Sequence, residues 1–257
     1  MSATTDYRAL LRVELRRLWT APIIAMVAGV AALGALIALS AVRPSRPLEI
    51  TQLLVQFHLT LFLPLVVAVF AVGLISNDVR SGWFRTLLMR PVTRPGYLFV
   101  KMAVALVSVW VTLLIGVSLP LWAIALLKAP QLECTVGQVL AAYAALVAQS
   151  ALLIVILTFL SCWLHGVLNI VFLLLWSMAV SIGDTVVNIQ FWDSKWLSIL
   201  VEYLFPSGFY NAATAISSRT HVPYAELLWG IAALAGFAAL AVWSINRIEV
   251  ERYVEQS

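Results

Sequence analysis

Long stretches without charge are the feature of this sequence that most restricts how the chain can fold. Six stretches are almost entirely apolar, and each has at least the roughly 18 residues that mark a membrane-spanning helix. They are residues 21–42, 53–75, 97–127, 136–163, 166–183 and 227–245. Continuous apolar runs indicate helices and not the alternating segments of a transmembrane β-barrel. We therefore predict an all-α polytopic membrane protein with six transmembrane helices.

Composition excludes the soluble classes. Of the 257 residues, 63% are hydrophobic and 11% are charged, whereas soluble chains are about 45–50% apolar and about 25% charged. Such a chain would aggregate in water, so residues 1–257 are assigned to one transmembrane domain. The formal net charge of +4 is too small to indicate a nucleic-acid partner. Cys134 and Cys162 have neither a disulfide framework nor the spacing of metal ligands.

Positive charge is distributed unevenly between the two sides of the predicted stack. If the N-terminus is cytoplasmic, the cytoplasmic segments hold eleven Lys and Arg residues: Arg8, Arg12, Arg16, Arg17, Arg80, Arg85, Arg90, Arg94, Lys101, Arg247 and Arg252. The outer segments hold five: Arg43, Arg46, Lys128, Lys195 and Arg219. The positive-inside rule therefore places both termini in the cytoplasm. About 20 residues of mixed charge precede the first run, which argues against a cleavable signal peptide.

Residues 6–19 have the pattern of an amphipathic helix lying on the membrane. At 100° per residue one face is apolar, formed by Tyr7, Leu10, Leu11, Leu15 and Leu18. Three arginines recur every four residues on a neighbouring face: Arg8, Arg12 and Arg16. Lipid bilayer is therefore an expected partner, with these cations directed toward anionic headgroups.

Glu14 falls on the apolar side of this helix, so it needs a cation nearby. Arg17, one turn further on, could pair with it, or Glu14 could meet a cation from another segment. The adjacent pair Arg16 and Arg17 could also suggest a twin-arginine signal. We interpret it instead as positive charge that holds the helix end at the cytoplasmic face.

The cytoplasmic loop at residues 76–94 is basic and carries large apolar side chains. Val79, Trp83, Leu87 and Met89 mark one or two amphipathic helical turns, and Pro91 ends them. An anchoring loop would need only scattered cations. This loop is therefore the best candidate for contact with a cytoplasmic partner, and a loop packed on itself is the alternative.

The outer segment at residues 184–226 is long and apolar. Two short pieces have helical spacing: Trp196, Ile199, Leu200, Tyr203 and Leu204 in the first, and Phe209, Ala212, Ala213 and Ile216 in the second. A break at Pro206, Ser207 and Gly208 separates them. Each piece is about half the length of a span, so a re-entrant helical pair is expected before the last span. Two helices lying flat on the outer surface are the alternative.

Motifs for catalysis and nucleotide binding are missing from the sequence. It has no G-x-x-x-x-G-K-[S/T] phosphate loop, no metalloprotease motif and no hydrolase elbow. Ion-coupled carriers usually have carboxylates inside their spans, and these spans have none. We therefore expect a chain that is not an enzyme and has no metal or cofactor of its own. A non-transporting membrane scaffold for a cytoplasmic partner, and an ion-coupled carrier, are the alternative functions.

The loop sequence resembles that of the ABC-2 type permeases, the membrane subunits of type-2 ATP-binding-cassette exporters. The shared positions are Asp78, Gly82, Leu87, Leu88, Pro91, Val92, Arg94 and Lys101. Asp replaces the more common Glu, Trp83 replaces a small residue, and Arg85 lies near a position that is often acidic. The predicted plan also resembles the family along nearly the whole chain.

The resemblance implies a bacterial inner-membrane exporter subunit. Two permeases would assemble with two cytoplasmic ATPase subunits, which hold ATP and Mg²⁺, and substrate would pass outward between the permeases. The loop would form a coupling helix that docks on the ATPase through Asp78, Arg80, Gly82, Trp83, Phe84, Arg85 and Leu88. The helix bearing Glu14 would move with the loop.

Overall fold

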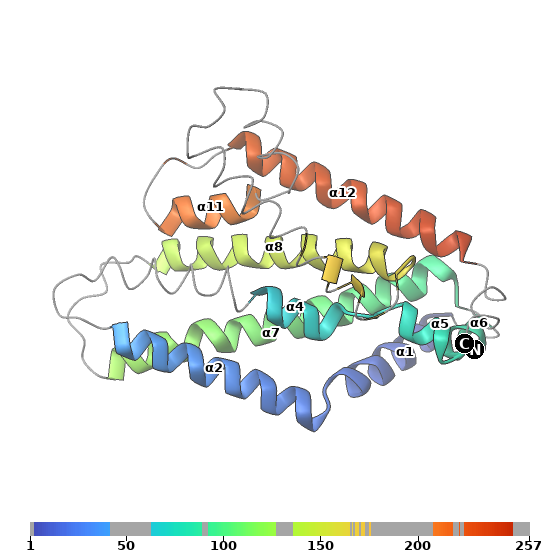
Figure 1. Cartoon of the computed structure of the whole chain (residues 1–257), viewed down its shortest axis with the longest axis horizontal. Coiled ribbons are helices and arrows are strands. Elements are labelled where there is room, and N and C mark those ends of the chain that lie inside the picture. Colours follow the sequence, from blue (N-terminus) through green and yellow to red (C-terminus); the bar gives the residue numbers. More distant parts are fainter. Residues whose placement is uncertain are drawn as a thin grey trace.

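The computed structural model is a bundle of long helices (Figure 1). It describes residues 3–41, 63–88, 92–126, 136–164, 208–217, 221 and 224–248, with six positions between 166 and 175. These described residues contain helices and no strand. Four of the described segments are long and apolar enough to cross a membrane: Leu63–Arg80, Arg94–Gly116, Tyr143–Ser161 and Tyr224–Arg247. The described part of the chain is therefore all-helical, and the chain is a multi-pass membrane protein.

Long helices account for most of the predicted apolar runs. They are α2 (Ala21–Ala41), α7 (Arg94–Leu126), α8 (Val136–Ser161) and α12 (Tyr224–Arg247). The 21 residues of α2 include no charged side chain, so α2 also has the length of a span. The 33 residues of α7 make roughly 50 Å of helix, longer than a bilayer core of ~30 Å. One end of α7 therefore extends beyond the membrane.

Two predicted runs are described only in part. Residues 53–62, and most of residues 166–183, lie outside the described residues. The count of six spans therefore stays a prediction.

A turn interrupts the helix near the end of the second predicted run. Helix α4 (Leu63–Ala71) stops at Ala71, residues 72–75 form a turn, and α5 (Ser76–Arg80) begins directly after it. The backbone N–H groups of Ile75 and Ser76 both donate to the Ser161 hydroxyl at the end of α8, each at 3.0 Å. The described part of the predicted run therefore contains a turn after Ala71, and a hydroxyl from a distant helix satisfies the amides that the turn exposes.

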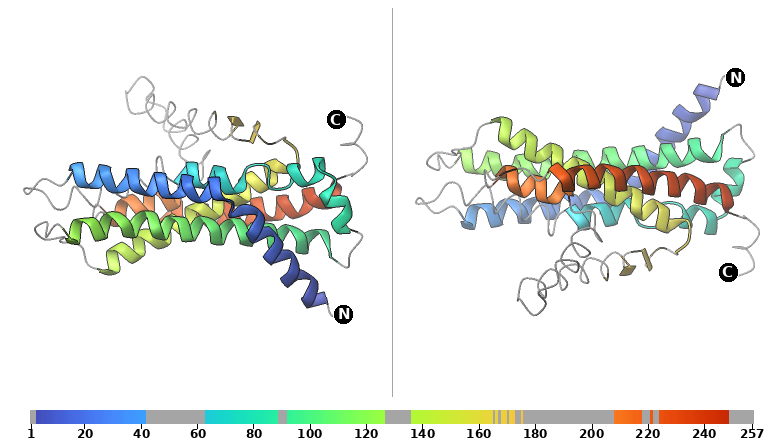
Figure 2. Two further views of the ribbon diagram at one scale, coloured as in Figure 1. Left: turned by 90° about the horizontal axis from the view of Figure 1, so that it is seen from below. Right: turned by 90° about the horizontal axis from the view of Figure 1, so that it is seen from above.

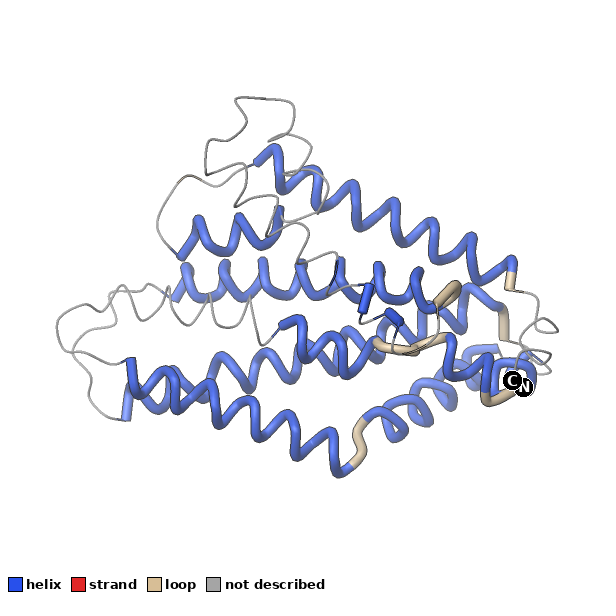
Figure 3. Tube along the Cα trace, viewed as in Figure 1, coloured by secondary structure: helices blue, strands red, loops and turns tan. Residues whose placement is uncertain are grey.

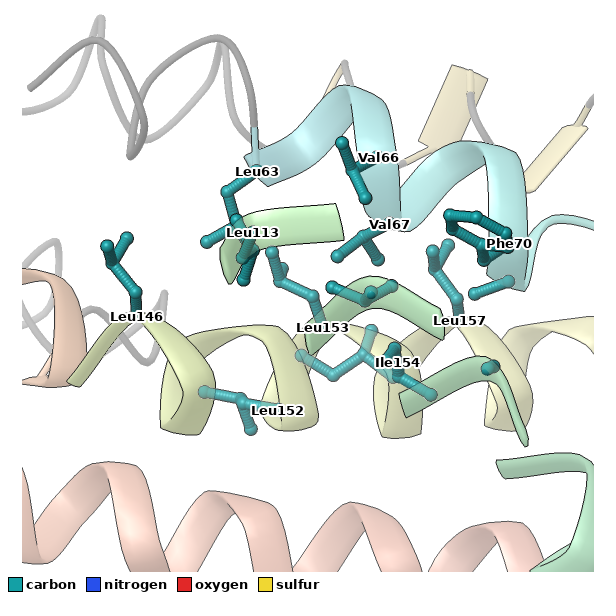
Figure 4. Packing of buried hydrophobic residues seen from close by; sticks show 14 of the residues in the cluster. Leu63, Val66, Val67, Phe70, Leu113, Leu146, Leu152, Leu153, Ile154 and Leu157 are labelled. Atoms are coloured by element: carbon teal, nitrogen blue, oxygen red, sulfur yellow. The ribbon is translucent and has the colours of Figure 1, made fainter. Parts of the chain in front are cut away.

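The main core lies where α4 meets α7 and α8. Figure 4 shows Leu63, Val67 and Phe70 of α4 directed toward these two helices. Leu113 of α7 and Leu157 of α8 are fully buried in the same cluster. Close packing here buries one face of α4.

A second core lies at the end of the bundle where α1 (Ala3–Leu18) and α6 (Trp83–Leu88) meet α5, α7 and α12. Its buried members are Leu10, Ile75, Val79, Phe84, Val92, Tyr97, Leu98, Cys162, Ala241, Ile245 and Ile248. The start of α1, the pair α5 and α6, and the end of α12 all lie at this end (Figures 1 and 2). A short break at Trp19 and Thr20 separates α1 from α2, and the two helices lie at an oblique angle to each other (Figure 3).

Helix α11 (Gly208–Ser217) packs against α8 and α12. Phe209 and Ala213 are buried in the main core, and Gly208 lies against the backbone of Glu226. The side chain of Asn211 donates to the Glu226 carboxylate. Pro206 and the first predicted outer helix lie outside the described residues, so a re-entrant pair stays a prediction.

Replacing Ser161 with alanine tests the junction between α4 and α5. The variant leaves two buried N–H groups without an acceptor, which costs roughly 1–3 kcal/mol per group. Thr158→Val is the matched control, because the Thr158 hydroxyl donates to Ile154 within its own helix. Unfolding in denaturing detergent should show a clearly larger loss of unfolding free energy for Ser161→Ala than for Thr158→Val. Equal losses would contradict this account of the turn.

Candidate functional site

The segment between α4 and α7 folds as two short helices joined by a tight turn. Gly82 lies in this turn with a φ of +73°, in the left-handed region that glycine adopts without strain. The Ser81 hydroxyl donates to the Asp78 carbonyl at 3.3 Å, and the Gly82 N–H donates to the Val79 carbonyl at 3.2 Å. Gly82 therefore forms the joint between α5 and α6.

Asp78 on α5 binds groups from two other helices. Its Oδ1 accepts from Arg17 Nη1 of α1 at 2.5 Å, and its Oδ2 lies 2.6 Å from Lys101 Nζ of α7. The hydroxyl of Tyr97, also on α7, donates to the same Oδ2. Only 1% of Asp78 is exposed, so this carboxylate joins α1, α5 and α7 from inside the protein.

Glu14 completes the charge cluster. Its Oε2 lies 2.6 Å from Lys101 Nζ, and only 1% of Glu14 is exposed. The sequence left two partners open for Glu14, and the structure pairs it with the cation of another segment. Arg17 pairs with Asp78 instead. The cluster therefore holds two carboxylates and two cations, and its formal charge is zero.

Because the cluster is largely buried, it selects one arrangement of the helices and adds little net free energy of unfolding. Moving charges out of water costs several kcal/mol per ion, and close pairing mostly offsets that cost. Removing one partner leaves a buried charge uncompensated. For Arg17, partial burial lowers the pKa and the Asp78 carboxylate raises it, with a raised pKa as the net result. The cluster thus favours one mutual position of α1, α5 and α7.

A second contact fixes α1 against the start of α7. The Thr93 N–H donates to the Tyr7 hydroxyl at 3.2 Å, and the Thr93 hydroxyl lies 3.2 Å from the same oxygen. These hydrogen bonds lower the pKa of Tyr7. Gly96 lies so close to the Tyr7 ring that a Cβ there would overlap it. Helix α1 is therefore held at both Tyr7 and Glu14.

Arg94 connects the start of α7 with the end of α12. Its Nη1 donates to the backbone carbonyls of Asn246 at 3.0 Å, Ile248 at 3.1 Å and Ile245 at 3.5 Å. Ile245 and Asn246 belong to the last turn of α12, which has no further turn of helix to bond their carbonyls, and Ile248 directly follows this helix. Arg94 thus caps α12 with a positive charge at its negative end.

The predicted docking residues divide into exposed and buried sets. Arg80, Gly82 and Arg85 are exposed, and Trp83 is half-buried with an Nε1 that has no partner among the described residues. Phe84 has no exposed surface, and its ring centre lies 5.3 Å from that of Tyr97. Asp78 and Phe84 lie behind the surface, because the charge cluster and the second core enclose them, and their predicted docking roles stay predictions.

The other predicted positions are placed as follows. Arg16 is exposed on α1, Arg94 and Lys101 bind within the chain, and Gly208 begins α11. Leu88 ends α6, but its side chain, like Pro91 and Pro206, lies outside the description. Among the described residues no three His, Cys, Asp or Glu side chains come together as a metal site.

Sequence reasoning missed the role of Tyr97. It treated this residue only as the start of an apolar run. Tyr97 and Lys101 are four residues apart, which places both on one face of α7. That spacing was the available signal, but the position of Asp78 opposite that face was not evident from the sequence.

Replacing Lys101 with methionine tests the charge cluster. Removing one member of a buried ion pair costs roughly 3–5 kcal/mol, because the Glu14 carboxylate is left without its cation. Adding Glu14→Gln should restore part of that loss, since it removes the uncompensated charge. Unfolding free energies of the single and double variants give the coupling. Strictly additive losses would show that the two residues do not interact.

Arg94→Gln should loosen the end of α12. Charge-assisted hydrogen bonds contribute roughly 1.5–3 kcal/mol, so amide hydrogen exchange near residues 245–248 should rise about tenfold or more. Arg247→Gln is the control, since it removes a cation of the same helix end that stacks on Trp243. An equal rise in both variants would refute the capping role.

Comparison with known families agrees with this architecture. Residues 10–180 match the family described as ABC-2 family transporter protein, and this range includes the charge cluster and the loop that carries Asp78. No curated protein matches the chain. The matched range is about two thirds of the sequence, and the chain belongs to the ABC-2 family of transporter proteins.

Proposed function

We propose that this chain is the membrane subunit of an exporter in the bacterial cytoplasmic membrane, driven by ATP that a separate ATPase subunit hydrolyses. Membership of the ABC-2 transporter family supports a role in membrane transport. Because the sequence has no phosphate loop, ATP and Mg²⁺ are assigned to the partner subunit. The exposed side of α5 and α6 is the proposed docking surface for that subunit.

The observation that carries this proposal is the position of Asp78. It belongs to α5, behind the proposed docking surface, and it binds α1 through Arg17 and α7 through Lys101 and Tyr97. Displacement of α5 would therefore act on both helices at once. The buried Phe84 ties α6 to the same region, since its ring contacts Tyr97. Such a joint suits rigid-body movement of helices driven from outside the membrane.

The charge cluster also has a second possible arrangement. Glu14 Oε1 is buried and has no hydrogen-bond partner among the described residues. Arg17 lies one helical turn from Glu14 and could pair with it if Asp78 moved away. In both arrangements each cation keeps a carboxylate. We propose that α1 switches between them as the partner ATPase closes and opens.

The assembly expected for this function has two copies of the permease and two ATPase subunits. Both termini would be cytoplasmic. The start of α1 and the end of α12 lie at the same end of the bundle as α5 and α6, which supports this orientation (Figure 1). Six spans and a re-entrant pair within residues 184–226 complete the proposed plan, and the packing of α11 against α8 supports the pair.

A charge reversal on the docking surface tests the proposal. Arg80→Glu with Arg85→Glu should reduce the Mg²⁺-dependent ATP hydrolysis that co-purifies with the tagged chain by about tenfold, because an acidic partner surface would be repelled. Both side chains are exposed, so the unfolding midpoint should not change. Arg247→Glu is the control. It reverses the charge of an exposed arginine on a different helix, α12, and should keep the ATP hydrolysis.

Three results would reject parts of the proposal. If the unmodified chain recovers no ATP hydrolysis from its native membrane, the ATP-driven function is wrong. A partner that binds without hydrolysing ATP would favour a membrane scaffold. Full ATP hydrolysis with the double variant would place the docking surface elsewhere on the chain.

A further inference from the structure

The exposed side of α5 and α6 carries two cations and a hydrogen-bond donor that lack partners within the described part of the chain. Arg80 and Arg85 are exposed, and neither has an ion-pair partner there. Trp83 lies between them in the chain, and its buried indole Nε1 has no acceptor there. Nearly all buried donors in folded proteins have an acceptor. Arg80, Trp83 and Arg85, here called the α5–α6 surface, therefore need negative charge and an acceptor from elsewhere.

Negative charge on the side predicted to be cytoplasmic is concentrated at the C-terminal end of the sequence. Six acidic residues belong to the segments predicted on that side: Asp6, Glu14, Asp78, Glu249, Glu251 and Glu255. Glu14 and Asp78 are buried in the charge cluster. Residues 249–257 hold three of the other four, with one cation, Arg252, so this segment has a formal charge of −2. The segment itself lies outside the described residues.

The chain enters this acidic segment directly from the second core. Ile248 is buried in the same cluster as Val79 and Phe84, and these two residues directly precede the arginines of the α5–α6 surface. An extended chain covers at most ~3.6 Å per residue, so Glu251 can lie up to ~11 Å from Ile248, and Glu255 up to ~25 Å. The acidic segment therefore starts beside the α5–α6 surface and is long enough to cover it.

The arginines of α1 are the other exposed cations at this end of the bundle. They are Arg8, Arg12 and Arg16. Among the described side chains of α1, no buried donor lacks an acceptor, whereas the α5–α6 surface has the indole N–H of Trp83. An acidic segment satisfies both needs of the α5–α6 surface, for charge and for an acceptor.

We propose that residues 249–257 bind the α5–α6 surface of the same chain. Their glutamates pair with Arg80 and Arg85, and an oxygen of the segment accepts from Trp83 Nε1. Exposed ion pairs are individually weak. A tether of a few residues raises the local concentration of the segment to the order of 1 mM, so a weak contact forms and is still displaced by a stronger partner.

This contact would regulate binding of the ATPase, because the same surface is proposed to dock that subunit. The regulatory consequence rests on the proposed function, whereas the contact itself does not. A chain whose surface is covered cannot bind the ATPase until the segment leaves. If the surface is covered for half to nine tenths of the time, the apparent affinity for the ATPase falls about two- to tenfold.

Disulfide trapping in the purified full-length chain tests the contact without a partner. Both native cysteines are first replaced by alanine. Val254→Cys is then combined with Thr86→Cys on the exposed side of α6, or with Val13→Cys on the exposed side of α1 as the matched control. The Thr86 pair should form its disulfide about tenfold faster, because the contact raises the local concentration of the segment there. Salt at 1 M should remove most of this difference, since it shortens the Debye length to about 3 Å.

Charge variants locate the contact. Glu249→Gln with Glu251→Gln and Glu255→Gln should slow trapping at Thr86→Cys by up to about tenfold, because three exposed ion pairs together amount to roughly that factor. Arg252→Gln is the control within the segment and should not slow it. Arg80→Glu with Arg85→Glu should also slow trapping, and adding Glu251→Arg with Glu255→Arg should restore most of the rate.

ATP hydrolysis tests the regulatory consequence. The triple glutamine variant should raise the Mg²⁺-dependent ATP hydrolysis that co-purifies with the tagged chain about twofold or more, because more copies have an open surface. If the unmodified chain recovers no ATP hydrolysis, the proposed function fails, and trapping still decides whether the contact exists.

Four results would overturn the proposal. Equal or faster trapping at Val13→Cys would show that the segment does not prefer α5 and α6. Unchanged trapping in the triple glutamine variant would show that its glutamates do not bind the arginines. Trapping with unchanged ATP hydrolysis in that variant would reject the regulatory role. A loss of ATP hydrolysis would instead make the segment part of the docking surface for the ATPase.

Discussion

Charges buried away from water are stable only when each has a partner of opposite sign. In this protein that constraint acts on three buried side chains, Glu14, Asp78 and Lys101, and the partly exposed Arg17 joins them. Asp78 accepts from Arg17 and Tyr97 and binds Lys101, and Lys101 binds Glu14. In the arrangement of the structure each of these charges has a partner of opposite sign, and the cluster joins α1, α5 and α7. The second core and the Arg94 cap of α12 lie at the same end of the bundle.

The neighbouring contacts extend this constraint to the rest of the same end of the bundle. Ser161 brings α8 to the turn that precedes α5, and Arg94 brings the end of α12 to the start of α7. The described part of the segment between α4 and α7 is therefore packed against α1, α7 and α8, and its exposed side carries Arg80 and Arg85.

Two surfaces of α1 have separate consequences. The inner surface contributes Glu14 and Arg17 to the charge cluster, and the outer surface exposes a row of arginines next to the start of a span. The side chain of Glu14 is turned inward to Lys101, so it does not offset the positive charge of this row.

The sequence by itself determined the fold class and most helix boundaries. A bilayer admits only long apolar helices or closed barrels, so α2, α7, α8 and α12 follow from runs of apolar residues. The sequence also indicated the loop at residues 76–94 as a candidate contact region, and it left two partners open for Glu14. Only the tertiary structure decided that Lys101 is that partner, that Asp78 and Phe84 are internal, and that Arg94 caps α12. These contacts join residues separated by about 20 to 150 positions, and periodicity reports only on neighbours within a few helical turns.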